Sequence, residues 1–143
     1  MIDRLDIQAL QVILGEYPYI AAAYLFGSCA SGKATPLSDV DIAILLNQDP
    51  PAGRKLLHEE DYLAYRIGKA IAAKEVDLVD LNNKGVIFQH NVLRTGRLIY
   101  DADPPFRIRF EKEVIIRFCD FEPTLRFIEK LQLKSRMERL GRP

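Results

Sequence analysis

The stretch that decides the fold is Phe26-Gly27-Ser28, followed after nine residues by Ser38-Asp39-Val40-Asp41. An almost unbroken apolar run, 20–26, leads into the first motif, and a second run leads out of the other motif to residue 46. Short apolar runs bounded by turn residues are typical of strands buried on both faces of a sheet. The sequence therefore predicts two buried strands, 20–26 and 39–46, with a glycine turn after the first and acidic residues at the start of the second.

Periodic apolar residues in the rest of the chain predict the elements around these strands. The expected elements are helices at 2–14, 54–74 and 84–95, a short helix at 28–33, and strands at 75–81 and 97–100. From Phe106 onward the spacing is helical again, and Pro123 is expected to split this tail into two helices. The predicted fold class is α/β, a small mixed sheet of about four strands with flanking helices and a C-terminal helical tail. We expect residues 1–105 to form the domain and 106–143 to form a helical extension of it.

The composition, 143 residues with 48% hydrophobic and 28% charged, is that of one globular domain. Basic and acidic residues are equal at 20 each, so no global positive field attracts nucleic acid, and we expect no such partner. Residues 107–143 carry ten basic and six acidic side chains, a net charge of +4, which leaves the first 106 residues at −4. Since neither a signal peptide nor an apolar run of ~18 residues is found, we expect a cytoplasmic protein without a membrane partner.

Asp39 and Asp41 are the first candidate site residues. Side chains two positions apart in a strand point to the same face, so the two carboxylates are expected to lie together. Close carboxylates repel each other and raise each other's pKa unless a cation lies between them. Mg²⁺ prefers oxygen ligands and is bound together with phosphate groups. The pair therefore predicts a magnesium site.

Gly27 and Ser28 are candidates for binding phosphate. Glycine allows a backbone to come close to a ligand, and the free N–H groups at the start of a helix attract anions. The Ser28 hydroxyl can add a hydrogen bond. One turn would then hold a phosphate group, and the next strand would hold the metal ion that the phosphate shares.

A third carboxylate is expected if two metal ions are to activate a hydroxyl and stabilise a leaving phosphate. Asp77 is the best candidate, because a lone acid among apolar neighbours in a strand is costly unless a cation or hydrogen-bond donors lie beside it. Asp80, three residues further on, points to the opposite face of a regular strand and ranks well below Asp77.

Each signal also has a simpler explanation when it is taken alone. A Gly-Ser pair often follows a strand without binding anything, an Asp-x-Asp often caps a helix or lies on a solvated edge, and Asp77 could pair with a lysine or arginine. All three in this order, each on a strand, are hard to attribute to packing. We interpret them as one site for a metal ion and phosphate.

These motifs resemble the signature of the polymerase-β-like nucleotidyltransferase superfamily: Gly27-Ser28, the nine-residue gap, Asp39-Val40-Asp41 and a later Asp77. The small size, the run Ser38 to Leu45 and the phrase Val92 to Tyr100 most resemble the minimal nucleotidyltransferases (MNT), which are often encoded beside HEPN-domain toxins and act as their antitoxins. The resemblance spans most of the chain, although only the Gly-Ser and Asp-x-Asp core is strongly specific.

The resemblance implies an enzyme that moves AMP from ATP, with Mg²⁺, to an acceptor hydroxyl such as a tyrosine of a HEPN toxin. Asp39, Asp41 and Asp77 would be the catalytic and metal-binding residues, with Asp77 as general base, and Gly27 and Ser28 would hold the β- and γ-phosphates. One position departs from the pattern, because Ser31 stands where the family often has arginine, and Lys33 is a possible substitute. Two alternatives stay open: a non-catalytic module that covers its toxin, and an enzyme that modifies an antibiotic.

Overall fold

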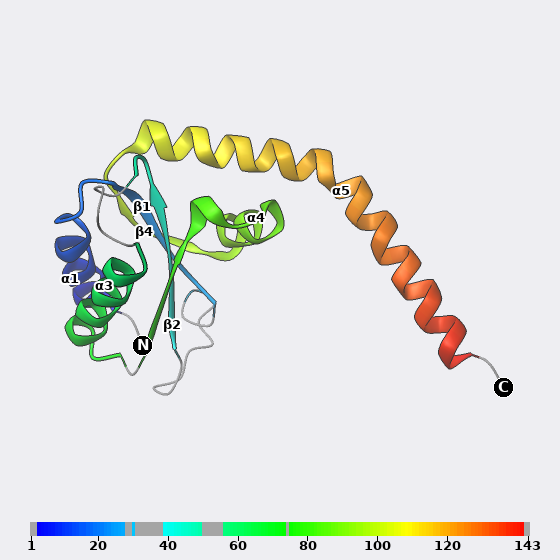
Figure 1. The fold of residues 1–143 in the computed structure, drawn as a ribbon, viewed down its shortest axis with the longest axis horizontal. Helices are drawn as coiled ribbons and strands as arrows, with labels where there is room; N and C mark the ends of the chain where they lie inside the picture. The colour runs from blue at the N-terminus through cyan, green and yellow to red at the C-terminus, as the bar shows by residue number, and fades with distance from the viewer. Residues whose placement is uncertain (1–2, 28–29, 31–38, 50–55, 74, 142–143) are drawn as a thin grey trace.

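The computed structural model describes residues 3–27, 30, 39–49, 56–73 and 75–141. Its elements, labelled as in Figure 1, are α1 (Arg4–Leu14), β1 (Ile20–Phe26), β2 (Val40–Leu46), α3 (Leu56–Ala70), β3 (Val76–Asp80), a 3₁₀ helix (Leu81–Asn83), α4 (Val86–Thr95), β4 (Arg97–Asp101) and α5 (Pro104–Leu140). The predicted α/β class is confirmed. The predicted short helix at 28–33 falls almost wholly outside the described residues.

The four strands form one mixed sheet in the order β3-β2-β1-β4. β1 runs antiparallel to both β2 and β4, whereas β2 and β3 are parallel. The two strands that the sequence marks as buried on both faces, β1 and β2, occupy the centre of the sheet, and all but their site-end residues Phe26 and Asp41 are buried. Because parallel strands need a crossover, α3 connects β2 to β3.

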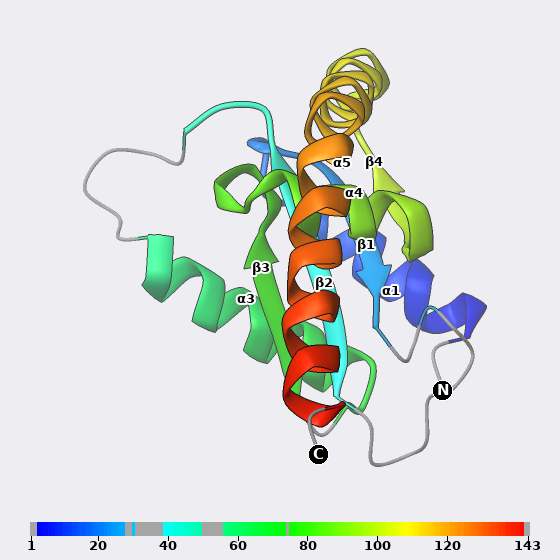
Figure 2. The same ribbon diagram turned by 90° about the vertical axis from the view of Figure 1, so that its right-hand side faces the viewer.

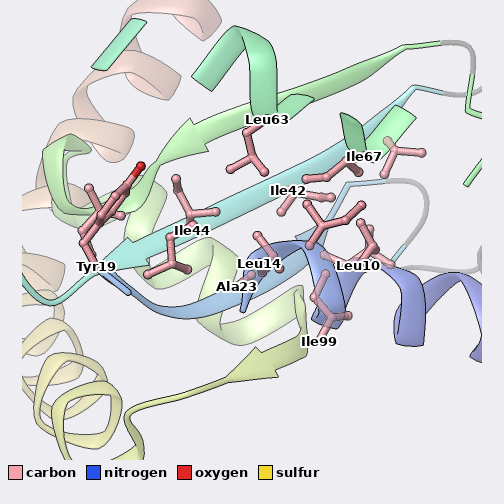
Figure 3. Packing of buried hydrophobic residues seen from close by; sticks show 14 residues of the cluster. Leu10, Leu14, Tyr19, Ala23, Ile42, Ile44, Leu63, Ile67 and Ile99 are labelled. Carbon is pink, nitrogen blue, oxygen red and sulfur yellow. The ribbon is translucent and has the colours of Figure 1, made fainter. Parts of the chain in front are cut away.

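Helices cover both faces of the sheet and create two apolar cores (Figure 1). On one face α1 and α3 pack against alternate residues of the central strands, and Figure 3 shows Leu10, Leu14, Ile42, Ile44 and Ile67 meeting there. On the other face α4 and the first part of α5 pack against Tyr24, Ala43 and Leu45. Helix α1 starts with a capping box, in which Asp3 and Asp6 each accept a hydrogen bond from the other's backbone N–H.

The prediction that Pro123 splits the tail is wrong, because α5 is one helix of 37 residues with Pro123 inside it. A proline in a helix removes one backbone hydrogen bond and crowds the preceding turn, which bends a helix without necessarily ending it. Figures 1 and 2 show the bend and the second half of α5 leaving the sheet. The first half packs against the domain, where Val114 is fully buried.

The other predicted elements are confirmed with small changes at their ends. The helix expected at 84–95 begins at Val86, because the residues before it form a 3₁₀ turn that Asp80 caps. Within the described part of the chain, no helix is long and apolar enough to span a membrane.

Candidate active site

Three of the predicted carboxylates lie at one end of the sheet. Asp41 in β2 and Asp77 in β3 are direct partners in the parallel pairing, and Asp39 comes one residue before β2 begins. Asp41 alternates with Ala43 and Leu45, and Asp77 with Val79, all of which pack on the face that carries α4 and α5. The strand register therefore directs these acids to the same face at neighbouring positions.

The environment of Asp41 favours its protonated form. Asp41 is half-buried, whereas Asp39 and Asp77 are exposed. Burial is the main cause that raises the pKa of Asp41 above its ordinary value, and the charges of Asp77 and Asp39 raise it further. These acids are thus close enough to repel Asp41, as carboxylates that share a cation site do when the cation is absent.

Gly27 allows Asp41 to approach the end of β1. Phe26, the last residue of β1, lies opposite Asp41 in the antiparallel pair, and Gly27 then turns the chain with a φ of +72°. A Cβ on Gly27 would lie 2.5 Å from Oδ2 of Asp41. The chain turns back at once, since the Ala30 N–H donates to the Gly27 carbonyl at 3.2 Å. Only glycine fits this turn while the carboxylate keeps its place.

Ser28, the other predicted phosphate-binding residue, lies outside the described residues, as do Ser31 and Lys33. The structure therefore brings Asp39, Asp41, Asp77 and Gly27 to one end of the sheet, and the role predicted for Ser28 stays a prediction.

The donor chemistry of this cluster fits a hard divalent cation, because three carboxylates provide only oxygen ligands. As the side chains stand, no three acidic, histidine or cysteine residues of the described ranges converge tightly enough to enclose an ion. Asp39 and Asp77 are exposed. Mutual repulsion keeps uncompensated carboxylates apart, and a bound cation would favour rotamers that bring the oxygens together.

Asp80 has a structural role. Its carboxylate accepts hydrogen bonds from the Asn82 N–H at 3.0 Å and from the Asn83 amide at 2.6 Å, which caps the 3₁₀ helix. Burial raises the pKa of Asp80, although these two hydrogen bonds oppose the shift. Because its carboxylate caps this helix, Asp80 is less suited than Asp77 to bind a ligand.

A polar network on the same face of the sheet, toward the end opposite the site, was missed in the sequence. The Tyr24 hydroxyl, on the face that carries Asp41, donates to Glu111 of α5 at 2.7 Å. Glu111 also pairs with Arg107 at 3.1 Å, and Nε of Arg107 lies 3.0 Å from Asp101 at the end of β4. The i, i+4 spacing of Arg107 and Glu111 was visible in the sequence, but nothing there indicated Tyr24 as their neighbour.

Comparison with known proteins identifies the class of protein that carries this fold and site. A family model described as "Polymerase beta, Nucleotidyltransferase" matches residues 8–105. The chain therefore belongs to the polymerase β nucleotidyltransferase family, which confirms the resemblance drawn from Gly27-Ser28 and Asp39-Val40-Asp41.

Individual relatives and solved structures are similar to most of this chain. The chain is 25% identical over 130 residues to protein adenylyltransferase MntA of Aphanizomenon flos-aquae (strain 2012/KM1/D3), which covers 86% of this chain and 82% of the relative. A chain from a crystal structure of a toxin–antitoxin with AMP-PNP superposes with a TM-score of 0.70 at 22% identity, over 90% of this chain and 99% of that one. A chain from the complex of tri-AMPylated Shewanella oneidensis HEPN toxin with MNT antitoxin gives a TM-score of 0.66 at 21% identity, with 90% and 98% covered. The structural matches establish a shared fold.

Proposed function

We propose that this nucleotidyltransferase transfers AMP from ATP to a tyrosine hydroxyl of a HEPN-type toxin and so acts as its antitoxin. The observation that carries the proposal is the pairing of Asp41 with Asp77 across β2 and β3, beside the Gly27 turn. Acids held at neighbouring positions by strand register, with one of them half-buried, form a site built for charge rather than for packing.

The reaction is a displacement at the α-phosphorus of ATP. The hydroxyl oxygen of the acceptor forms a new bond to this phosphorus, the bond between the α-phosphorus and its bridging oxygen to the β-phosphorus breaks, and pyrophosphate leaves. Asp77, which is exposed and lies at the edge of the acid cluster, takes the proton of the hydroxyl as general base. A magnesium ion, when bound, supplies Lewis-acid stabilisation of the charge on the phosphate oxygens.

Other residues of this chain would bind the metal ion and the phosphate groups. Asp39 and Asp41 would hold the metal ion, and the half-buried position of Asp41 fixes its carboxylate more firmly than an exposed one. Gly27 and Ser28 would receive the β- and γ-phosphates, since a backbone turn with a glycine leaves N–H groups accessible to an anion.

The names of similar proteins support the proposed acceptor, a HEPN toxin, and the proposed nucleotide, ATP. One is called a protein adenylyltransferase, a second belongs to a toxin–antitoxin structure with AMP-PNP, and a third belongs to a complex of a tri-AMPylated HEPN toxin with an MNT antitoxin. All three match most of this chain. A protein substrate is also consistent with a domain that ends in a long, largely exposed helix.

The test is intact mass spectrometry of a HEPN toxin, taken from the neighbouring gene and incubated with this protein, ATP and Mg²⁺. The toxin is expected to gain one or more AMP groups on tyrosine. Asp39→Asn and Asp77→Asn should abolish the gain, whereas the control Asp120→Asn, an exposed acid on α5, should leave it intact. A toxin that is neutralised equally well by all these variants without any mass gain would reject the enzymatic proposal in favour of a covering module.

A further inference from the structure

The second half of α5 is an arm that no other described element covers. We define the arm as residues 124–140, which follow the bend at Pro123. Every residue from 126 to 140 is exposed. Six of these residues are large and apolar: Phe127, Ile128, Leu131, Leu133, Met137 and Leu140. Because a helix with apolar side chains around its circumference is typically buried, the arm has the composition of a helix that a partner covers.

One side of the arm continues the apolar stripe by which α5 packs on the domain. In the first half of α5, Val114 is fully buried and the Phe118 ring stacks on His90 of α4 with centroids 3.6 Å apart. Leu125 and Ile128 come 11 and 14 residues after Val114, which is about three and about four helical turns. They therefore lie on the side of α5 that packs on the domain, but beyond the part that the domain covers.

The bend at Pro123 turns the arm toward the face of the sheet that carries Asp41. The ring of a helical proline crowds the carbonyl four residues before it, which opens the helix on the side of the proline. Pro123 comes nine residues, or about two and a half turns, after Val114, so it lies on the opposite side of α5. The helix therefore bends toward the side of Val114. Figures 1 and 2 show the arm standing away from the sheet on this side and running from the level at which β2 ends to the level at which it begins.

The length and the charge of the arm define what fits beside it. The 17 residues from 124 to 140 span roughly 25 Å of helix, and the 7 residues of β2 span roughly 23 Å, so the arm extends to the end of the sheet that carries the acid cluster. Residues 124–140 have five basic and two acidic side chains, a net charge of +3. A suitable partner has an apolar surface with acidic residues at its rim.

We propose that the arm is the docking surface for the protein that carries the acceptor tyrosine, an inference that rests on the proposed function. The partner covers the apolar side chains of the arm and lies between the arm and the face of Asp41. Its tyrosine then reaches the acid cluster while contacts remote from the reaction hold it in place, which raises the effective concentration of the hydroxyl. A second copy of this chain is a poorer occupant, because two arms of the same charge repel each other.

The experiment measures binding and AMP transfer separately, with the full chain and the HEPN toxin from the neighbouring gene. Ile128→Glu is expected to raise the Kd for the toxin at least about thirtyfold, since it places a charge in an apolar interface. The KM for the toxin should rise while kcat stays within about threefold of wild type, and the rise in melting temperature with ATP and Mg²⁺ should be unchanged. Ile128→Leu should bind the toxin within about threefold of wild type. The matched control is Ile116→Glu, on an equally exposed isoleucine of α5 before the bend, which should also stay within about threefold.

Four results would overturn the inference. Ile128→Glu binds the toxin as wild type does; Ile116→Glu weakens binding as much, which would place the docking surface outside the arm; Ile128→Glu loses thermal stability and the response to ATP without rescue by Ile128→Leu, which would assign the residue to the fold; or the chain without toxin is a dimer that Ile128→Glu dissociates, which would assign the arm to a second copy. In each case the wild type still transfers AMP, so the proposed function survives. A wild type that binds the toxin with the expected loss in Ile128→Glu, but transfers no AMP, would reject the proposed function and leave the docking surface in place.

Discussion

Gly27 and Asp41 are in such close contact that a Cβ on the glycine would lie 2.5 Å from the carboxylate oxygen Oδ2. Two strands that are consecutive in the chain create this contact, since Phe26 pairs with Asp41 and Gly27 is the next residue. The glycine therefore does more than turn the chain. It leaves the space in which the most buried of the three acids is held.

Gly27→Ala is expected to abolish transfer and to lower the free energy of unfolding by about 1–3 kcal/mol, the cost of a strained backbone position. Two effects add up: alanine is disfavoured at a φ of +72°, and its methyl group displaces the Asp41 carboxylate. Denaturant unfolding of a double-mutant cycle separates the two effects. In the Asp41→Ala background, Gly27→Ala should show only the backbone cost, because the carboxylate is no longer there to be displaced. If Gly27→Ala were equally destabilising with and without the Asp41 carboxylate, the contact between the two positions would contribute nothing to stability.

Asp41→Asn is expected to stabilise the metal-free protein at neutral pH while abolishing transfer. The folded state raises the pKa of Asp41 above its ordinary value of 3.8, so it binds the proton more tightly than the unfolded state does. Ionised Asp41 therefore destabilises the fold, and this penalty appears as the pH rises through the ordinary value and persists above the raised one. Thermal melts without metal should show the variant above wild type at pH 7 and level with it below about pH 3.5.

Added Mg²⁺ provides the complementary measurement. It should raise the melting temperature of wild type, because a ligand that binds only the folded state stabilises it, and it should raise that of Asp41→Asn much less. An equal rise in both proteins would contradict a role of Asp41 in metal binding.

Local sequence was sufficient to predict the central strands, because 20–26 and 42–46 are apolar on both faces and turn residues or acids precede or follow them. It also predicted that Asp39 and Asp41 share a face, which follows from strand geometry alone. The contact between Gly27 and Asp41 could not be predicted, since it depends on the register between β1 and β2. The pairing of Asp41 with Asp77 depends likewise on the parallel register of β2 and β3 across the α3 crossover.

The error at Pro123 has a different origin. The rule that proline ends a helix disregards the other possibility, that the helix bends at the proline and continues beyond it, as α5 does at Pro123. The hydrogen bond that joins Tyr24 of β1 to Glu111 of α5 could not be predicted either, because the two residues are 87 positions apart.

Pro123→Ala is expected to strengthen the helix where it now bends. Alanine restores the missing backbone N–H and is favoured over proline in a helix interior by about 3 kcal/mol. Hydrogen exchange should show slower exchange of the amides just after position 123, whereas the neighbouring control Thr124→Ala should change little. Unchanged protection after Pro123→Ala would mean that the bend is not caused by the proline.

The last prediction concerns the network that attaches α5 to the sheet. Burial, together with the hydrogen bond to Glu111, raises the pKa of Tyr24, so its hydroxyl stays protonated and donates at 2.7 Å. Tyr24→Phe leaves Glu111 with Arg107 alone, and the lost bond to a charged acceptor should cost about 1.5–3 kcal/mol of unfolding free energy. Glu111→Gln should cost less on top of Tyr24→Phe than by itself, because the two residues share one interaction. The control Tyr62→Phe, on an exposed tyrosine of α3, should lie within about 0.5 kcal/mol of wild type. Additive costs of Tyr24→Phe and Glu111→Gln would mean that α5 is attached by its apolar contacts around Val114 and not by this hydrogen bond.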